Sequence, residues 1–269
     1  MTQFTKEARI GTIGWGYSDW NGYFYPSDMQ SRDALPTYSK VFNSVEIDTT
    51  FYGVPRETTV QNWVKSTPDD FVFCPKTPRL ITHDLGLIGA EEPFRRFVDV
   101  MSHLGKKLGP ILIQLPPSFT GDDFPALRSF LSLLDTLDNP GVRFAVEVRS
   151  RSLLIEDLYQ LLAEHQVAFV SIDWVGMPRR FEATTDFVYV RLLGKHDAFT
   201  THYEVQSNRQ KDIEKWGQVF IKNQNKFEKI FIYSNNDYEG YSPSTSNRMK
   251  IELGLPIVEP VVEVQGSLF

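Results

Sequence analysis

Charged side chains alternate with apolar ones in several short segments of this chain. Two such runs are Val45-Glu46-Ile47-Asp48 and Val146-Glu147-Val148-Arg149. In an extended strand, successive side chains point to opposite faces, so each run has one apolar face and one charged face. A parallel strand that is buried on both faces would instead be apolar throughout. The pattern therefore predicts strands whose charged faces line a functional site.

The residues on these charged faces combine acids that could transfer protons with cations that could hold an anion. We predict four catalytic residues, with Glu46 or Glu147 as the general base: Glu46, Glu147, Asp173 and Lys76. The guanidinium fork matches phosphate and carboxylate geometry, so Arg149 and Arg191 are predicted to clamp an anion. The other predicted substrate-binding residues are Trp15, Asp48, Tyr52, Arg79, Gln114, Asn235 and Asn236. A second interpretation stays open, in which the acids only hold the arginines in place.

Metal and cofactor binding have weaker support. Glu46, Glu147 and Asp173 could hold a divalent ion through oxygen ligands. Lys76 and the arginines on the same wall would repel a cation, so we assign no metal ligand and keep a divalent ion as an alternative. Histidines are few, and a single cysteine excludes a zinc site built from several cysteines. No nicotinamide or flavin motif occurs, so the sequence identifies no cofactor.

The elements that would position these residues alternate along the chain. Eight apolar runs are predicted strands: residues 9–15, 44–50, 71–76, 111–115, 143–149, 168–173, 187–192 and 229–234. Amphipathic stretches are predicted helices: residues 33–42, 57–65, 91–107, 124–137, 152–165 and 208–222. This alternation predicts an α/β fold, a single TIM-like (β/α)8 barrel over residues 1–256, with its site where the strands end. Residues 174–185 are too few for a helix with two loops, so one outer helix is expected to be reduced or missing there.

Several of these runs carry a family resemblance. Gly11-Thr12-Ile13-Gly14-Trp15, the run from Val45 to Tyr52, Gln114-Leu115-Pro116-Pro117-Ser118-Phe119 and Asn235-Asn236 resemble the family called domain of unknown function 72, the YecE-like proteins. The resemblance implies a TIM-like barrel and implies no activity. This sequence departs from the family pattern at positions where histidines are common, which here are Ser150, Leu193 and Asp237. Those departures remove imidazoles from the presumed site.

The last residues form a separate feature. Residues 257–269 are predicted to be a C-terminal tail that ends in Gln265-Gly266-Ser267-Leu268-Phe269. This ending resembles the short peptide by which bacterial replication and repair proteins bind the sliding clamp of DNA polymerase. Leu268 and Phe269 would fill an apolar pocket while Gln265 would hydrogen-bond at its edge. The alternative is that the tail packs back on the barrel.

Composition narrows the function classes. The 269 residues are 41 % hydrophobic with a formal net charge of −6, which is typical of a globular protein and argues against nucleic-acid binding over the whole surface. No apolar run approaches 18 residues, so we expect a cytoplasmic protein with no membrane contact. We expect a rim pocket for a small anionic ligand or a nucleic-acid phosphate, in DNA repair or processing. The alternatives are a sugar-phosphate or small-acid isomerase or lyase, and a non-catalytic ligand- or DNA-binding adaptor recruited by its tail.

Overall fold

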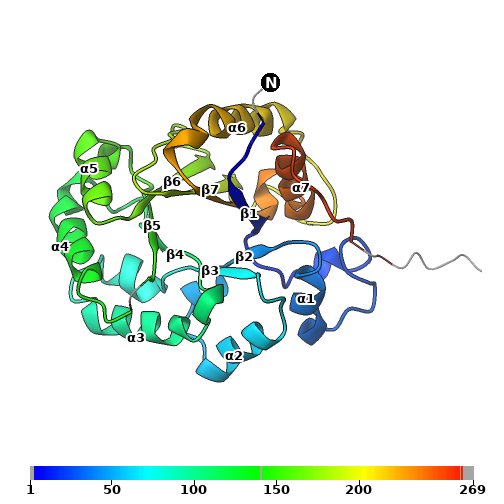
Figure 1. Cartoon of the computed structure of the whole chain (residues 1–269), viewed down its shortest axis with the longest axis horizontal. Helices are drawn as coiled ribbons and strands as arrows, with labels where there is room; N and C mark the ends of the chain where they lie inside the picture. Colours follow the sequence, from blue (N-terminus) through cyan, green and yellow to red (C-terminus); the bar gives the residue numbers. More distant parts are fainter. Residues whose placement is uncertain (1–2, 140, 261, 263–269) are drawn as a thin grey trace, which may run out of the picture.

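The computed structural model describes residues 3–139, 141–260 and 262. Eight strands lie within these residues: β1 Glu7–Thr12, β2 Ser44–Ile47, β3 Val72–Pro75, β4 Ile111–Gln114, β5 Phe144–Glu147, β6 Ala168–Trp174, β7 Phe187–Gly194 and β8 Lys229–Ser234. Six of them form a parallel sheet in the order β1-β8-β7-β6-β5-β4, and β2 pairs with β3 in a second parallel sheet. Figure 1 shows the strands arranged around one centre, so that both sheets contribute to a common interior.

The two sheets meet at two seams. At the first seam, Ile13 and Glu46 form an isolated bridge between β1 and β2, and the Gly14 amide donates to the Glu46 carbonyl at 2.8 Å. At the second seam, Lys76 and Leu112 form a bridge between β3 and β4. A Cβ at Gly11 would lie 2.0 Å from the Ser44 carbonyl oxygen, so only glycine permits this approach of β1 to β2. The structure thus shows a six-stranded and a two-stranded sheet joined by bridges.

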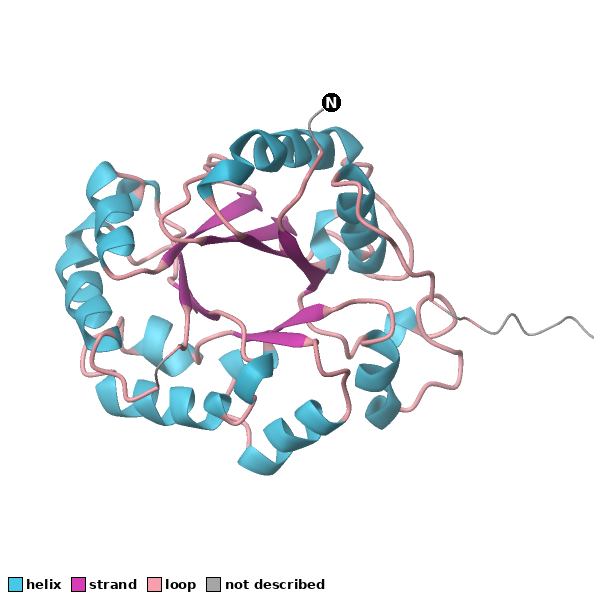
Figure 2. Cartoon of the chain, viewed as in Figure 1, coloured by secondary structure: helices cyan, strands magenta, loops and turns pink. Residues whose placement is uncertain are grey.

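Helices surround the strands, as Figure 2 shows. They are α1 Ser31–Tyr38, α2 Glu57–Lys65, α3 Glu91–Ser102, α4 Phe124–Leu134, α5 Glu156–Glu164, α6 Gln210–Asn223 and α7 Ser242–Glu252. In α3, Phe94, Phe97, Val98 and Met101 recur at the helical spacing and are buried, while Glu91 and Glu92 occupy its first turn, where the helix dipole favours acids. No described helix is long and apolar enough to cross a membrane.

Element boundaries differ from the predicted ones in an informative way. The predicted strand over residues 44–50 ends at Ile47, and Thr49–Phe51 forms a short 3₁₀ turn. The Thr50 hydroxyl donates to the Lys76 carbonyl at 2.6 Å, so this turn is tied to the end of β3. Residues 175–186 contain no helix between β6 and β7, as the short spacing indicated.

Candidate functional site

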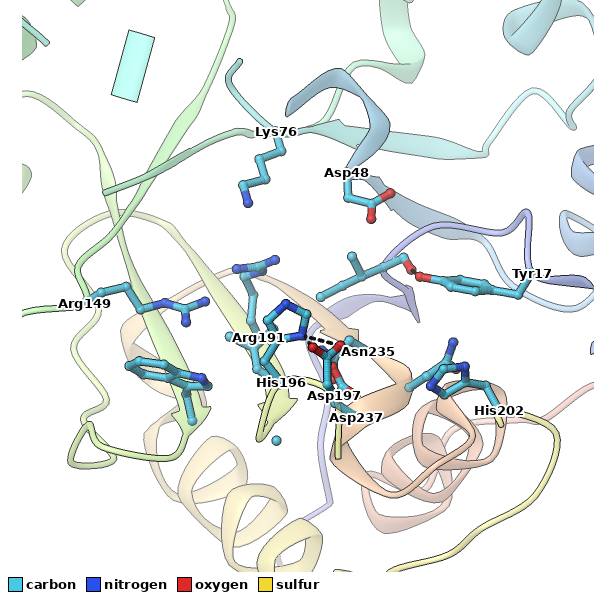
Figure 3. Close-up of a pocket in the computed structure, with 15 residues that line it drawn as sticks. Tyr17, Asp48, Lys76, Arg149, Arg191, His196, Asp197, His202, Asn235 and Asp237 are labelled. Atoms are coloured by element: carbon cyan, nitrogen blue, oxygen red, sulfur yellow. Dashed lines mark hydrogen bonds and ion pairs between the residues drawn. The ribbon is translucent and has the colours of Figure 1, made fainter. Parts of the chain in front are cut away.

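A pocket of about 430 Å³ lies at the carboxyl ends of the strands. Predicted site residues reach it from several strands: Asp48 after β2, Lys76 after β3, Arg149 after β5, Arg191 in β7, and Asn235 and Asn236 after β8. The carboxyl ends of parallel strands meet at one edge, which is why residues so far apart in sequence converge. Figure 3 shows Lys76, Arg149 and Arg191 pointing toward the same space.

A buried ion network forms the floor of this pocket. Arg191 binds Glu46 in a bidentate manner, with its Nε 2.9 Å from Oε2 and one Nη 2.8 Å from Oε1. Its other Nη lies 2.6 Å from Glu147, and the Nε of Arg149 donates to the remaining oxygen of Glu147. The Tyr189 hydroxyl also donates to Glu46 at 2.8 Å. All four carboxylate oxygens therefore already accept hydrogen bonds.

The two glutamates of the network have different electrostatic surroundings. Burial raises the pKa of Glu46, although Arg191 opposes the shift. Burial acts in the same direction on Glu147, but Arg149 and Arg191 outweigh it and lower the pKa of Glu147 to about 2. Glu147 is thus a firmly ionised anchor for two arginines. The contacts of Glu46 and Glu147 match the second interpretation above, in which these acids hold the arginines.

Arg149 presents its free donors to the pocket. Its Nε is bound to Glu147, and its guanidinium carbon lies 4.4 Å from the centre of the Trp174 ring. Neither Nη of Arg149 hydrogen-bonds within the described chain, whereas Arg191 uses its Nε and both of its Nη atoms on glutamates. Arg149 is therefore fixed through its Nε, which is bound to Glu147. Its two Nη atoms remain able to bind an anion with two parallel hydrogen bonds.

Lys76 differs from both arginines because it has no anionic partner. Its ammonium nitrogen lies 3.9 Å from the centre of the Phe51 ring, and among the described residues no carboxylate oxygen comes within 4 Å of it. Burial and the neighbouring Arg191 lower the pKa of Lys76 to about 8, although Glu147 and Glu46 oppose the shift. A lysine with such a pKa exists in both its neutral and its charged form near neutral pH.

Asp48 and Lys76 each follow the last residue of one of two paired strands, β2 and β3, whose final residues Ile47 and Pro75 pair with each other. Both residues line the pocket. Burial raises the pKa of Asp48, and Lys76 opposes this shift. Gly14, at a φ of +75°, makes room for the carboxylate, because a Cβ there would lie 3.2 Å from Oδ1 of Asp48. Asp48 is consequently a carboxyl group at the pocket whose pKa lies above its ordinary value.

Asn235 and Asn236 each leave one buried polar atom without a partner. The Asn236 Oδ1 accepts from the amide and the hydroxyl of Ser242, at 3.0 and 2.8 Å, and so caps α7. In the described part of the chain, the Nδ2 of Asn236 and the Oδ1 of Asn235 bond to nothing. Buried polar atoms are rarely left unpaired, and four further side-chain atoms of the described chain share this property: Trp20 Nε1, Thr77 Oγ1, Ser171 Oγ and Asn247 Oδ1.

Seven predicted site residues do not line this pocket. Two of them, Glu46 and Glu147, belong to the buried ion network beneath it, and the other five lie elsewhere. The prediction that the Asp173 side chain faces the interior is wrong. Ile172 pairs with Arg191 and faces the interior, so its neighbour Asp173 faces the opposite side. There Asp173 accepts a hydrogen bond from the indole N–H of Trp216 in α6 at 3.1 Å. The alternation in β6 fixed which residues share a face and did not fix which face points inward. The other four have local roles or are exposed: Trp15 packs on Trp63, Tyr52 is exposed, Arg79 pairs with Asp84, and Gln114 donates to the Leu115 carbonyl.

Six further residues line the pocket and were not among the predicted site residues. They are Trp174 at the end of β6 and, outside the strands, Tyr17, His196, Asp197, His202 and Asp237. The Nδ1 of His196 lies 3.1 Å from Asp197 and 3.8 Å from Asp237. The only signal in the sequence was that His196 and His202 lie in the segment after a predicted strand. The sequence does not show where such a loop places its side chains.

Two further predictions meet different outcomes. No cluster of three or more His, Cys, Asp or Glu side chains suited to a metal ion occurs among the described residues. Gln265, Leu268 and Phe269 lie outside the residues that the structure describes, so clamp binding stays a prediction.

Comparisons with known proteins point to one family. A family model described as "Protein of unknown function DUF72" matches residues 9–265. The UPF0759 protein YecE of Escherichia coli K12 is 35 % identical over 141 residues, which cover 52 % of this chain and 47 % of YecE. The UPF0759 protein YunF of Bacillus subtilis 168 is 37 % identical over 116 residues, covering 41 % of this chain and 40 % of YunF. The match thus spans less than half the length of these curated relatives.

Solved structures agree with this assignment. The DUF72 family protein TM1631 from Thermotoga maritima superposes with a TM-score of 0.75 at 25 % identity, covering 92 % of this chain and 99 % of that protein. The DUF72 family protein EF0366 from Enterococcus faecalis gives a TM-score of 0.74 at 22 % identity, covering 94 % and 100 %. SacUVDE gives 0.54 at 8 % identity, covering 94 % and 100 %, and this likeness concerns the fold alone.

Proposed function

We propose, from the premise that this chain belongs to the DUF72 family of proteins of unknown function, that it is an enzyme acting on a small phosphorylated or carboxylated substrate. The anionic group of the substrate binds at the free edge of Arg149, and Lys76 faces the same pocket. This is the sugar-phosphate or small-acid class of substrate considered from the sequence.

The observation that carries this proposal is that Arg149, Arg191 and Lys76 have different partners at the pocket. Glu46 and Glu147 both bind Arg191, and Glu147 also binds one edge of Arg149, so these four residues form a fixed and balanced unit. The free edge of Arg149 is the guanidinium surface left to meet an anionic ligand, and the Lys76 amine lies at the same pocket. A preorganised guanidinium suits a phosphate or a carboxylate.

The size of the pocket favours a small molecule over a nucleic-acid strand. Its volume of about 430 Å³ lies in the usual range for small-molecule sites. The net charge of −6 would also repel a polyanion over most of the surface. Action on a nucleic-acid-derived substrate, with recruitment to DNA by the tail, stays the second candidate, and clamp pull-down tests it.

We also infer that the eight strands act as one closed TIM-like barrel whose seams are the isolated bridges. Support comes from contacts across the interior, where Glu46 of β2 bonds to Tyr189 and Arg191 of β7. Such a barrel gives the pocket a rigid floor.

The test is anion binding measured by thermal shift and calorimetry with inorganic phosphate, ribose 5-phosphate and pyruvate. The wild type should be stabilised, because a ligand that binds only the folded state raises the melting temperature. Arg149→Met should lose most of this effect. Arg151→Met is the matched control, since Arg151 is an exposed arginine of the same loop that does not line the pocket. Equal stabilisation of Arg149→Met and the wild type would refute the proposal.

A further inference from the structure

We infer that Lys76 is a nucleophilic amine that forms a Schiff base with its substrate, which makes the substrate an aldehyde or ketone that also carries a phosphate or carboxylate. This inference deepens the proposed function and rests on it, because Arg149 would hold the anionic group while Lys76 attacks the carbonyl carbon.

The surroundings of the Lys76 amine suit a nucleophile more than an ion-pair partner. Its nitrogen lies over the face of Phe51 and bonds to no acceptor within the described residues. A buried structural lysine is satisfied by protein acceptors, as Lys107 is by the carbonyls of Val64 and Thr67 at 2.7 and 2.8 Å, whereas Lys76 is half-buried at the pocket. The Lys76 amine is instead left free to react.

Charged groups around Lys76 also favour a reactive amine. The groups that face it are Glu46, Asp48, His83, Glu147, Arg149 and Arg191. Arg191 and Arg149 disfavour the ammonium form, and the two glutamates that would favour it are already bound to those arginines. Desolvation beside another cation is an established way to activate a lysine.

Asp48 supplies the proton transfers that Schiff-base formation needs. The neutral amine forms a C–N bond to the carbonyl carbon, and the displaced π pair of the C=O bond takes a proton to give a hydroxyl group. The new ammonium returns a proton to Asp48, which leaves a neutral carbinolamine. The nitrogen lone pair then expels the hydroxyl group as water, protonated by Asp48. One amine, one carbonyl group and one proton thus give one iminium ion and one water.

The product explains the choice of substrate class. An iminium ion withdraws an electron pair from the adjacent carbon, so it assists removal of a proton there or cleavage of the next C–C bond. These are the steps of an isomerase or a lyase. Asn235 and Asn236 line the same pocket.

Reductive trapping tests the inference directly. The full chain is incubated with pyruvate or glyceraldehyde 3-phosphate and cyanoborohydride, and the labelled lysine is located by mass spectrometry of peptides. We expect a secondary amine at Lys76 at probe concentrations that leave exposed lysines such as Lys211 unlabelled. The rate should rise between pH 7 and 9, because the pKa of Lys76 is lowered to about 8.

A second buried lysine provides the matched control. Burial alone lowers the pKa of Lys250 to about 8, and its ammonium donates to the Val41 carbonyl at 3.2 Å. If a low pKa were sufficient for labelling, Lys250 would be trapped as well. We expect labelling of Lys76 without labelling of Lys250, and we expect Asp48→Asn to slow trapping by about tenfold or more.

The outcomes separate this inference from the proposed function. If phosphate stabilises the protein through Arg149 but Lys76 is trapped no faster than Lys211, the Schiff base is refuted and anion binding stands. If Lys76 is trapped selectively but neither phosphate nor Arg149→Met changes the rate, the amine is reactive and the anion site is refuted. Selective trapping that phosphate inhibits supports both.

Discussion

Ion pairs at the two ends of the same strands are built in different ways. At the amino ends, Arg143 pairs with Asp186, and their side chains are 38 % and 61 % exposed. At the carboxyl ends, Arg191 pairs with Glu46, and their side chains are 5 % and 0 % exposed. Exposed pairs contribute little and are easily replaced, whereas a buried pair must overcome a large desolvation cost. The comparison indicates that the carboxyl ends carry the chemistry.

Each end also has a lysine whose pKa is lowered to about 8. Lys250, near the amino ends, donates to a backbone carbonyl and lies 4.6 Å from the centre of the Phe42 ring. Lys76, at the carboxyl ends, lies among arginines and makes no such bond within the described chain. Burial is common to both lysines, so a difference in their reactivity would come from the neighbours and the pocket.

The largest expected effect comes from removing one arginine at each end. Arg191→Met should lower the free energy of unfolding by about 3–5 kcal/mol, because it leaves Glu46 buried without a counter-ion. Arg143→Met should cost less than about 1 kcal/mol, since its partner is exposed to water. Urea denaturation of both variants measures the contrast, and similar losses would show that the two networks are equivalent.

Replacing the lysines should stabilise the protein. Lys76→Met should raise the free energy of unfolding at pH 7 by up to about 3 kcal/mol, because the folded state holds this ammonium with a pKa of about 8 against 10.5 for an ordinary lysine. Lys250→Met should gain less, by about 1 kcal/mol, because it also loses a hydrogen bond. A loss of stability in Lys76→Met would contradict the view that this lysine is kept for function.

The pH dependence of stability sharpens the same comparison. A lysine whose pKa is lowered in the folded state makes folding release protons, so its penalty is present at low pH and disappears as pH rises from about 8 toward 10.5. The stability advantage of Lys76→Met over the wild type should therefore shrink across this range. Chemical denaturation at pH 7, 8, 9 and 10 measures it, and a constant difference would mean that Lys76 keeps its ordinary pKa.

The smallest effect is expected from the tail. Deleting residues 265–269 should change the stability by less than about 0.5 kcal/mol and leave anion binding intact, because the shortened chain keeps every strand and every residue that lines the pocket. The same deletion should abolish capture by an immobilised sliding clamp if the terminal motif binds it. Retained capture would show that the motif is not the contact, and lost anion binding would show that the tail belongs to the pocket.

The sequence by itself determined the alternation of strands and helices and the edge at which the site forms. Glu46, Lys76, Glu147, Arg149 and Arg191 were predicted from strand ends, and they meet because parallel strands share one carboxyl edge. The absence of a helix between β6 and β7 followed from the small number of residues between these two strands.

Tertiary structure decided which of these groups are free to act. A period of two cannot say which face of β6 points inward, so Asp173 was placed on the wrong side. The same alternation cannot show that Arg191 binds two glutamates while Arg149 and Lys76 keep groups able to bind a ligand. The partners of Arg191 lie more than forty residues away in the sequence. Pairing across the interior is a property of the assembled strands, and the local pattern in each strand does not contain it.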